Sequence, residues 1–442
     1  MGNIVTFTAL FQTLSSAEML KYLFNKYKNR SDFTNNFLIL FRGTLIAQLI
    51  PLLLTPILTR IYTPADFGVF ELFLSVSLIL GAVANGRYEL ALVLPDKKED
   101  AWNLLGLGFI VSFCFSVLLF ILAGLFADQI AGWLNNADIK FWLYFVPLAV
   151  LLQGWFGLLR YYKTRKKDFK NISAANISRA SSRTGFQLLL GIIVNSPAGL
   201  IIGQITGFFA GIVMLLRKVD INRFFRHLNK QNIIQQGKRY KRFPLFTMPS
   251  TLANSASVNL TGILISAMYS IASVGFYSLA NRVLGMPGTL IGKSLSNVYY
   301  KEAVDHRKKH GHAKIVFKST LKKLLLIAFP LFLLIFLFAE DIFALVFGEE
   351  WRVAGKYARI LIPLFFIRLI VAPVSVTLSV FERQHISLFW QLGLLFLSLA
   401  VFAIAWIVSW PVEMFLICFA SVLFFYYVLF IFILWKVASN KL

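Results

Sequence analysis

The chain places positively charged residues inside segments that are otherwise apolar enough to cross a membrane. In "YSLANRVLGMPGTLIGKSL", residues 277–295, Arg282 and Lys293 share one helical face with Ser278 and Thr289, because successive spacings are four, seven and four. A cation at membrane depth is costly, so it normally faces an interior partner or a water-filled cavity. A guanidinium can hold two phosphate oxygens through parallel hydrogen bonds, and lysine adds a point charge. The stripe therefore suits an anionic, phosphate-bearing ligand.

Polar stripes of this kind recur in other apolar segments, at 34–60, 171–195, 243–268 and 358–381. Arg179, Arg183 and Gln187, for example, follow one another at steps of four and so share a helical face. We expect these faces to line one cavity between the helices, with hydroxyls and amides suited to sugar. The candidate substrate-binding residues are Arg282, Arg368, Arg42, Lys293, Arg183, Arg179, Gln187, Gln48 and Asn254.

For several of these cations, a structural role is the alternative to ligand binding. Arg282 and Arg368 lie about 12 Å from the nearer membrane surface at 1.5 Å per residue, which favours a cavity role over an internal salt bridge. The leading salt-bridge partner is Glu71. Arg179 can equally reach back to the membrane surface, and Arg87 with Glu89 can form an ion pair near that surface.

The composition excludes a soluble protein. Hydrophobic residues make up 58% of the 442 residues, against about 45–50% in soluble domains, and the mean hydropathy is +0.72. No removable signal peptide is evident, and residues 1–18 precede a second plausible initiator, Met19, so we expect them to be dispensable. Twelve spanning helices are predicted near 34–60, 66–92, 101–126, 139–160, 171–195, 198–217, 243–268, 273–298, 321–338, 358–381, 386–409 and 412–435.

The net charge of +24 is concentrated in alternate connections between these helices. Lysine and arginine cluster at 160–170, 217–242 and 299–323, whereas the intervening connections carry few cations. Short basic loops stay in the cytoplasm, which places both termini there. Topology and lipid headgroups therefore explain the basic character better than nucleic acid does.

An internal repeat indicates two halves. "YTPADFGVFEL" at 62–72 and "YSIASVGFYSL" at 269–279 match at a constant offset of 207 residues. Six helices separate them, so the halves have the same orientation and are related by an axis along the membrane normal. We expect an all-α membrane protein with a cytoplasmic segment (1–33), an N-terminal six-helix lobe (34–218), a basic linker (219–242) and a C-terminal six-helix lobe (243–442).

Two stretches resemble a known family. "PLLLTPILTRIYTPADFGVFELFLSVSLILGAVANGRYELALVLPDKKEDAWNLL" (51–105) and "VGFYSLANRVLGMPGTLIGKSLSNVYYKEA" (274–303) are similar to the bacterial polysaccharide-unit flippases of the O-antigen type. These belong to the multidrug/oligosaccharidyl-lipid/polysaccharide exporter superfamily. The resemblance implies two lobes around a cavity in the bacterial inner membrane. It also implies that an undecaprenyl-diphosphate-linked oligosaccharide crosses from the cytoplasmic to the periplasmic leaflet, for O-antigen or capsule synthesis. Membrane lipids and the polysaccharide polymerase machinery are the expected partners.

Motifs for chemistry are absent from the sequence. No phosphate-binding G-x-x-x-x-G-K-[ST] loop occurs, and the cluster His306, His310 and His312 lies among cations that repel a metal ion. Cys114 and Cys418 both lie in apolar runs and form no disulfide frame. We therefore expect no enzyme, cofactor or metal site.

Two other functions are the alternatives to a flippase. A multidrug or cation exporter of the same fold would favour buried carboxylates, and a glycan polymerase or ligase would need a larger outer loop than 339–357.

Overall fold

The computed structural model describes residues 32–194, 196–217 and 219–440. At a few described positions, Lys293 among them, the backbone but not the side chain is described. The expectations for residues 1–31, including a start at Met19, lie outside the described residues. Within the described ranges the chain is helical and contains no strand, so the predicted all-α class is confirmed.

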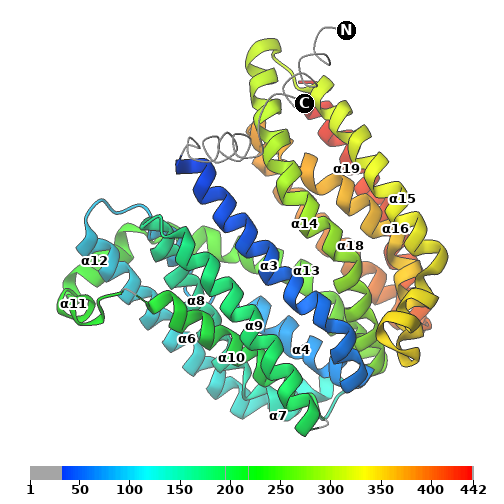
Figure 1. The fold of residues 1–442 in the computed structure, drawn as a ribbon, viewed down its shortest axis with the longest axis horizontal. Coiled ribbons are helices and arrows are strands. Elements are labelled where there is room, and N and C mark those ends of the chain that lie inside the picture. The colour runs from blue at the N-terminus through cyan, green and yellow to red at the C-terminus, as the bar shows by residue number, and fades with distance from the viewer. Residues whose placement is uncertain (1–31, 195, 218, 441–442) are drawn as a thin grey trace, which may run out of the picture.

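The N-terminal lobe contains helices that match the first six predicted spans, two of them with a short companion helix. They are α3 (Asp32–Ile61), α4 (Pro64–Gly81) with α5 (Tyr88–Ala91), α6 (Lys98–Trp133), α7 (Ile139–Leu143) with α8 (Val146–Arg165), α9 (Phe169–Ile193) and α10 (Ala198–Leu216). Two short helices follow in the basic segment between the lobes, α11 (Ile221–Arg226) and α12 (Lys230–Arg239). Figure 1 shows α6–α12 gathered on one side of the molecule.

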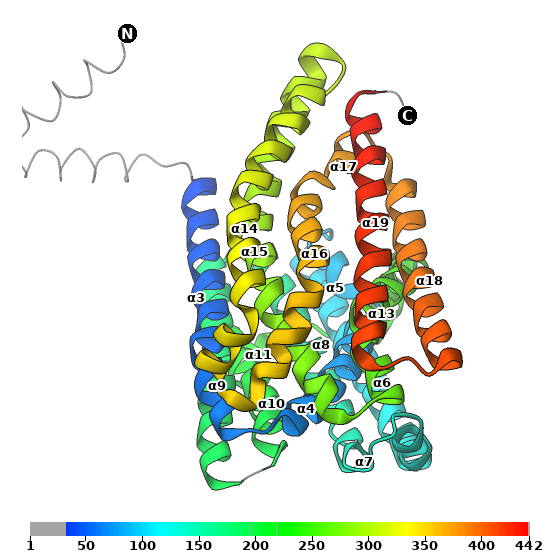
Figure 2. The same cartoon turned by 90° about the vertical axis from the view of Figure 1, so that its right-hand side faces the viewer.

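The C-terminal lobe matches the other six predicted spans. Its elements are the helical turn η1 (Phe243–Thr247), α13 (Met248–Met268), α14 (Ile271–His310), α15 (Lys314–Phe347), the turn η2 (Glu349–Trp351), α16 (Arg352–Val374), α17 (Thr377–Val380), α18 (Gln384–Val408) and α19 (Val412–Ala438). The α14–α15 turn, the first described residues of α3 and the end of α19 lie at one end of the molecule, and α7 lies at the other (Figure 2). We call the latter the α7 end.

Nine helical segments in the described ranges are long and apolar enough to cross a membrane. The three long helices that fall short of this test are α9, α13 and α14. These three helices carry the polar stripes identified in the sequence, which lower their mean hydropathy. The twelve-helix count agrees with the structure for that reason.

The repeated sequence forms equivalent helix starts in the two lobes. The Thr63 hydroxyl accepts a hydrogen bond from the Asp66 backbone N–H at 3.2 Å, and the Asp66 carboxylate accepts from the Thr63 N–H at 2.9 Å. At the position 207 residues later, the Ser270 hydroxyl accepts from the Ser273 N–H at 3.3 Å. Each cap satisfies N–H groups that have no partner inside the helix. The sequence match therefore marks the start of α4 and of α14.

Helices α4 and α14 cross at van der Waals contact through two repeat-related glycines. A Cβ atom on Gly68 would overlap the carbonyl oxygen of Ile271, and one on Gly275 would overlap the carbonyl oxygen of Pro64. Positions 64 and 271, like 68 and 275, are 207 residues apart. The contact is thus reciprocal, as expected for two halves related by a two-fold axis. Only glycine permits this approach of the two backbones.

Further contacts join the lobes at the α7 end. The Trp351 indole N–H donates to the Thr59 carbonyl at 2.9 Å, and its ring packs edge-on against Phe67, with ring centroids 5.0 Å apart. The Ser266 hydroxyl donates to the Leu134 carbonyl at 2.7 Å. Because each of these contacts pairs a residue of one lobe with a residue of the other, the lobes are held together at this end.

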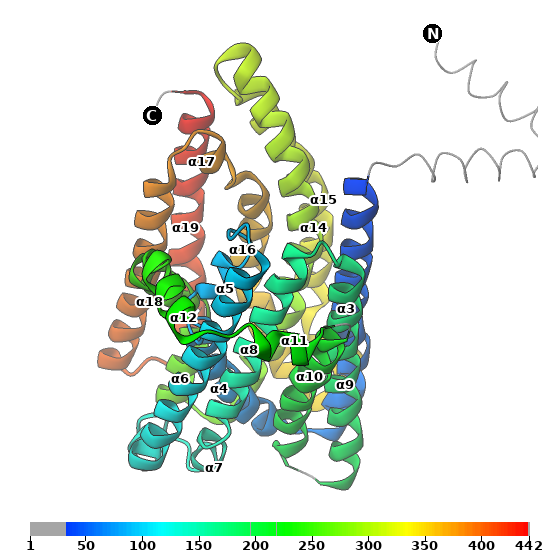
Figure 3. The same cartoon turned by 90° about the vertical axis from the view of Figure 1, so that its left-hand side faces the viewer.

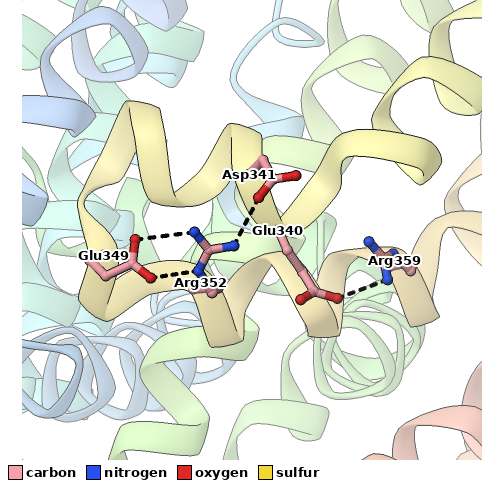
Figure 4. A network of polar contacts seen from close by, with 5 residues as sticks. All are labelled: Glu340, Asp341, Glu349, Arg352 and Arg359. Carbon is pink, nitrogen blue, oxygen red and sulfur yellow. Dashed lines mark hydrogen bonds and ion pairs between the residues drawn. The ribbon is translucent and has the colours of Figure 1, made fainter.

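An ion-pair network supports the turn that carries Trp351. Arg352 contacts Glu349 at 2.5 Å and Asp341 at 2.8 Å, and Arg359 contacts Glu340 at 2.8 Å (Figure 4). These side chains are at least partly exposed, so water and salt screen each pair and its contribution to stability is small. The expected outer loop at 339–357 is mostly helical, because α15 continues past a kink at Phe338 and η2 leads directly into α16. This connection therefore packs against the lobes instead of forming a separate loop.

Candidate ligand-binding site between the lobes

Charged side chains from four helices converge where the two lobes meet. Glu71 of α4 interacts electrostatically with Arg183 of α9 and with Arg282 of α14. Arg368 of α16 and Glu71 both interact electrostatically with Tyr277 of α14. We call these five residues the central cluster. It contains three arginines and one glutamate, and its members come from both lobes.

Aromatic rings lie beneath each arginine of the central cluster. The guanidinium carbon of Arg282 is 5.8 Å from the centroid of the Phe67 ring, and that of Arg183 is 5.7 Å from Phe70. Arg368 lies 5.4 Å from Phe365 and 5.6 Å from Tyr427. An aromatic face attracts a cation but accepts none of its in-plane N–H bonds, which remain able to bind an oxyanion.

The cluster arginines lack close counter-ions. Within the described residues, none of the three forms an ion pair with a carboxylate closer than 4.0 Å. The Nε atoms of Arg183 and Arg368 are buried and have no hydrogen-bond partner in the described part of the chain. A buried donor without a partner costs about 1–3 kcal/mol. Arg282 and Glu71 interact, as the salt-bridge alternative requires, yet they do not form the close pair that would saturate the guanidinium.

A row of glycines fixes the polar stripe of α9. Gly203 and Gly207 of α10 lie against Gln187 and Arg183, so closely that added Cβ atoms would press on these residues. A Cβ on Gly211 would press first on the Phe156 ring and also on Arg179. Small residues at steps of four allow such close packing of membrane helices. The row holds the backbone of α9 while the Arg183 guanidinium reaches over to Phe70 of α4.

The remaining candidates lie outside the central cluster. Gln187 is buried and donates to the Leu200 carbonyl at 3.0 Å, and Arg179 lies 5.0 Å from the Phe156 ring within its own lobe. Arg42 and Asn254 are exposed and Gln48 is half-buried. The side chain of Lys293 is not described. The structure thus brings together three of the nine candidates, Arg183, Arg282 and Arg368.

The sequence analysis did not identify Tyr277 or the aromatic rings that lie beneath the arginines of the central cluster. Phe67, Phe70 and Glu71 stand at spacings of three and four and therefore share one face of α4, which was a readable signal. The ion pair considered for Arg87 and Glu89 is present at 3.0 Å, with Glu89 only 5% exposed. Glu89 therefore balances the charge of Arg87, and this ion pair is not part of the central cluster.

Comparisons with known proteins place the chain in a family. The family described as polysaccharide biosynthesis protein matches residues 57–356. The chain is 21% identical to an uncharacterised membrane protein in the cps region of Klebsiella pneumoniae, covering 75% of this chain and 67% of that protein. It is also 21% identical to the succinoglycan biosynthesis transport protein ExoT of Rhizobium meliloti (strain 1021), covering 68% of this chain and 59% of that protein.

A solved structure shares the fold. The lipid II flippase MurJ, in an inward closed conformation, matches with a TM-score of 0.64 at 14% identity, over 92% of this chain and 90% of that one. Identity at this level shows the fold alone. The family match extends over more than half of the residues. The chain belongs to the polysaccharide biosynthesis protein family.

Proposed function

We propose that the chain is a flippase that moves undecaprenyl-diphosphate-linked oligosaccharide units from the cytoplasmic to the periplasmic leaflet of a bacterial inner membrane. The unit serves a surface polysaccharide such as O-antigen or capsule, and it passes to a polysaccharide polymerase after transport. The central cluster carries this proposal, because it gathers three arginines from both lobes, none of which has a close counter-ion among the described residues. Guanidinium groups bind phosphate oxygens in pairs, so the cluster matches a diphosphate.

The lobes act as two rigid units in this proposal, residues 34–218 and 243–442, joined by the segment 219–242. The crossing of α4 and α14 closes the α7 end, which is the periplasmic end. The diphosphate enters from the cytoplasmic end, where Arg42 and Lys293 contribute cations, and the amide of Asn254 contacts sugar. Separation of the lobes at the α7 end then releases the unit to the periplasm. No covalent bond is made or broken, so the chain is not an enzyme.

We place both termini in the cytoplasm, because lysine and arginine cluster in alternate short connections and such basic connections stay on the cytoplasmic side. Cysteines placed at the exposed positions Lys166, Gln235 and His310 are expected to resist impermeant thiol reagents in intact cells. A cysteine at Asn135, between α6 and α7, is expected to react. Labelling of any of the first three at the rate of Asn135 would overturn this topology.

Transport by the purified protein tests the function directly. After reconstitution into vesicles with a fluorescent lipid-linked oligosaccharide, we expect the lipid to become accessible on the opposite leaflet with its glycan unchanged. A lengthened glycan would instead indicate a polymerase. Transport of a cationic dye without transport of the lipid would indicate a multidrug exporter, for which Glu71 is the carboxylate available in the central cluster.

A further inference from the structure

A second polar site lies beside the N-terminal lobe and shares no residue with the central cluster. It is a cavity of about 730 Å³ between the start of α6, the end of α8 and the segment around α11. We call it the basic cavity. Its charged lining consists of five cations and two carboxylates: Lys98, Arg165, Lys166, Lys167, Arg223, Asp96 and Asp220.

The walls of the basic cavity are held by hydrogen bonds and ring contacts. Arg165 donates to the carbonyl of Pro95 and, at 3.1 Å, to that of Asp96, which fixes the segment after α5. The Trp102 indole N–H donates to the Tyr162 hydroxyl at 2.7 Å. The Arg223 guanidinium carbon lies 5.7 Å from the centroid of the Trp102 ring. The cavity is therefore part of the folded lobe and not a gap between loose loops.

The cations of the basic cavity have no close counter-ion. Within the described residues, none of the five forms an ion pair closer than 4.0 Å. Arg165 donates to backbone carbonyls, which leaves four cations, Lys98, Lys166, Lys167 and Arg223. Asp220 instead caps α11, where its carboxylate accepts from the Arg223 backbone N–H at 2.9 Å. The cavity is thus net positive and has cations free to bind an anion.

An apolar groove of about 420 Å³ adjoins the basic cavity and shares Tyr162 with it. Its other lining residues include Phe109, Ile110, Ile212, Phe224 and Phe225, from α6, α10 and α11. Helix α11 contributes to both sites, because Arg223 lines the basic cavity while Phe224 and Phe225 line the groove. Figure 3 shows α11 lying across the helices of this lobe. Ile110 and Phe225 are 51% and 64% exposed, so the groove opens at the surface of the molecule.

We propose that the basic cavity and the apolar groove form one binding site for an anionic phospholipid of the cytoplasmic leaflet. The phosphate headgroup occupies the cavity, and one acyl chain lies in the groove. A soluble phosphate compound would use only the cavity, and a neutral lipid would leave the four cations without a partner. An anionic phospholipid carries both groups in one molecule and is present at this depth. The bound lipid ties α11, and with it the segment between the lobes, to the N-terminal lobe.

Lipid titration of the purified, delipidated full chain in a neutral detergent tests the headgroup part. Phosphatidylglycerol is expected to raise the melting temperature and to remain bound in native mass spectrometry, and phosphatidylcholine at the same concentration is not. The double variant Lys166→Gln/Arg223→Gln should raise the phosphatidylglycerol concentration for half-maximal stabilisation about tenfold or more. The matched control, Lys308→Gln/Lys309→Gln on the exposed end of α14, removes the same charge and should leave that concentration unchanged.

Two further arms test the acyl chain and the identity of the lipid. Phe225→Ser, at an exposed position, should weaken binding of phosphatidylglycerol, and glycerol phosphate alone should give no stabilisation. Equal stabilisation by phosphatidylcholine or by glycerol phosphate would overturn the proposal, as would equal weakening in the control variant. Displacement of phosphatidylglycerol by undecaprenyl diphosphate, lost in the same variants, would assign the site to the transported lipid instead. None of these measurements depends on transport.

Discussion

Replacement of Gly68 or Gly275 by alanine is expected to force the lobes apart at the α7 end and to lower transport about tenfold. In each case the added methyl group would overlap a backbone carbonyl oxygen of the other lobe, that of Ile271 or of Pro64. A backbone oxygen within a helix cannot turn aside as a flexible side chain can, so α4 and α14 must separate. Overpacking of this kind costs about 1–3 kcal/mol, and about 1.4 kcal/mol changes an equilibrium tenfold.

The expected consequence is a shift toward the state that is open at the α7 end. Transport of lipid-linked oligosaccharide, normalised to the amount of protein in the membrane, measures the loss. A reporter cysteine at Ser278, in the same helix as Arg282, measures the opening, because impermeant thiol reagents should reach it faster from the periplasmic side in the glycine variants.

The control for these variants is Gly124→Ala. Gly124 lies on an exposed face of α6, and an added Cβ there meets no atom within 4 Å, so transport should equal that of the wild type. The two test variants should also resemble each other, since their contacts are related by the repeat. Normal transport by either variant at equal abundance would show that the crossing does not have to separate at each cycle.

The positions of the spanning helices could be predicted because they depend on local properties. A run of apolar residues long enough to cross the membrane identifies a helix wherever it packs. The match between Tyr62 and Tyr269 likewise indicated two halves, and both hydroxyls donate to a carbonyl of their own lobe, Gln187 at 2.6 Å and Trp410 at 3.0 Å. The crossing of Gly68 with Ile271 could not be predicted, because it depends on how the lobes are placed relative to each other.

Part of the candidate site could also be predicted from the sequence, because helical spacing is a local property. Helical spacing identified the faces that carry Arg183, Arg282 and Arg368, but it could not distinguish them from Gln187, which packs against α10 on the same face of α9. The glycines at 203, 207 and 211 offered a signal for that packing, since steps of four by small residues favour close contact of helices. Phe365 stands three residues before Arg368 in α16, and Phe67 and Phe70 share one face of α4, so these rings also gave a local signal. The pairing of Phe67 with Arg282 and of Phe70 with Arg183 could not be predicted, because it depends on contacts between helices.

Arg282→Ala is expected to reduce transport on the order of 30-fold while the protein still inserts in the membrane. The substitution removes a guanidinium that forms no close ion pair with any residue the structure describes and that lies over Phe67 of the other lobe. Hydrogen bonds to charged groups contribute about 1.5–3 kcal/mol each, so the loss of a phosphate contact accounts for an effect of this size. Arg282→Lys retains the charge but not the paired geometry, and its transport should fall about 3- to 10-fold. Arg60→Ala, at an exposed arginine at the end of α3, serves as the control and should transport normally.

The rival explanation is that Arg282 is needed only to neutralise Glu71. Under that explanation Arg282→Ala would leave a carboxylate without a cation, and Glu71→Ala in the same chain would restore transport. Glu71 also interacts with Arg183, however, so it keeps a positive neighbour when Arg282 is removed. We therefore expect the double variant to transport no better than Arg282→Ala alone. Recovery of the double variant to near the wild-type rate, at equal membrane abundance, would show that Arg282 acts on Glu71 and not on the transported diphosphate.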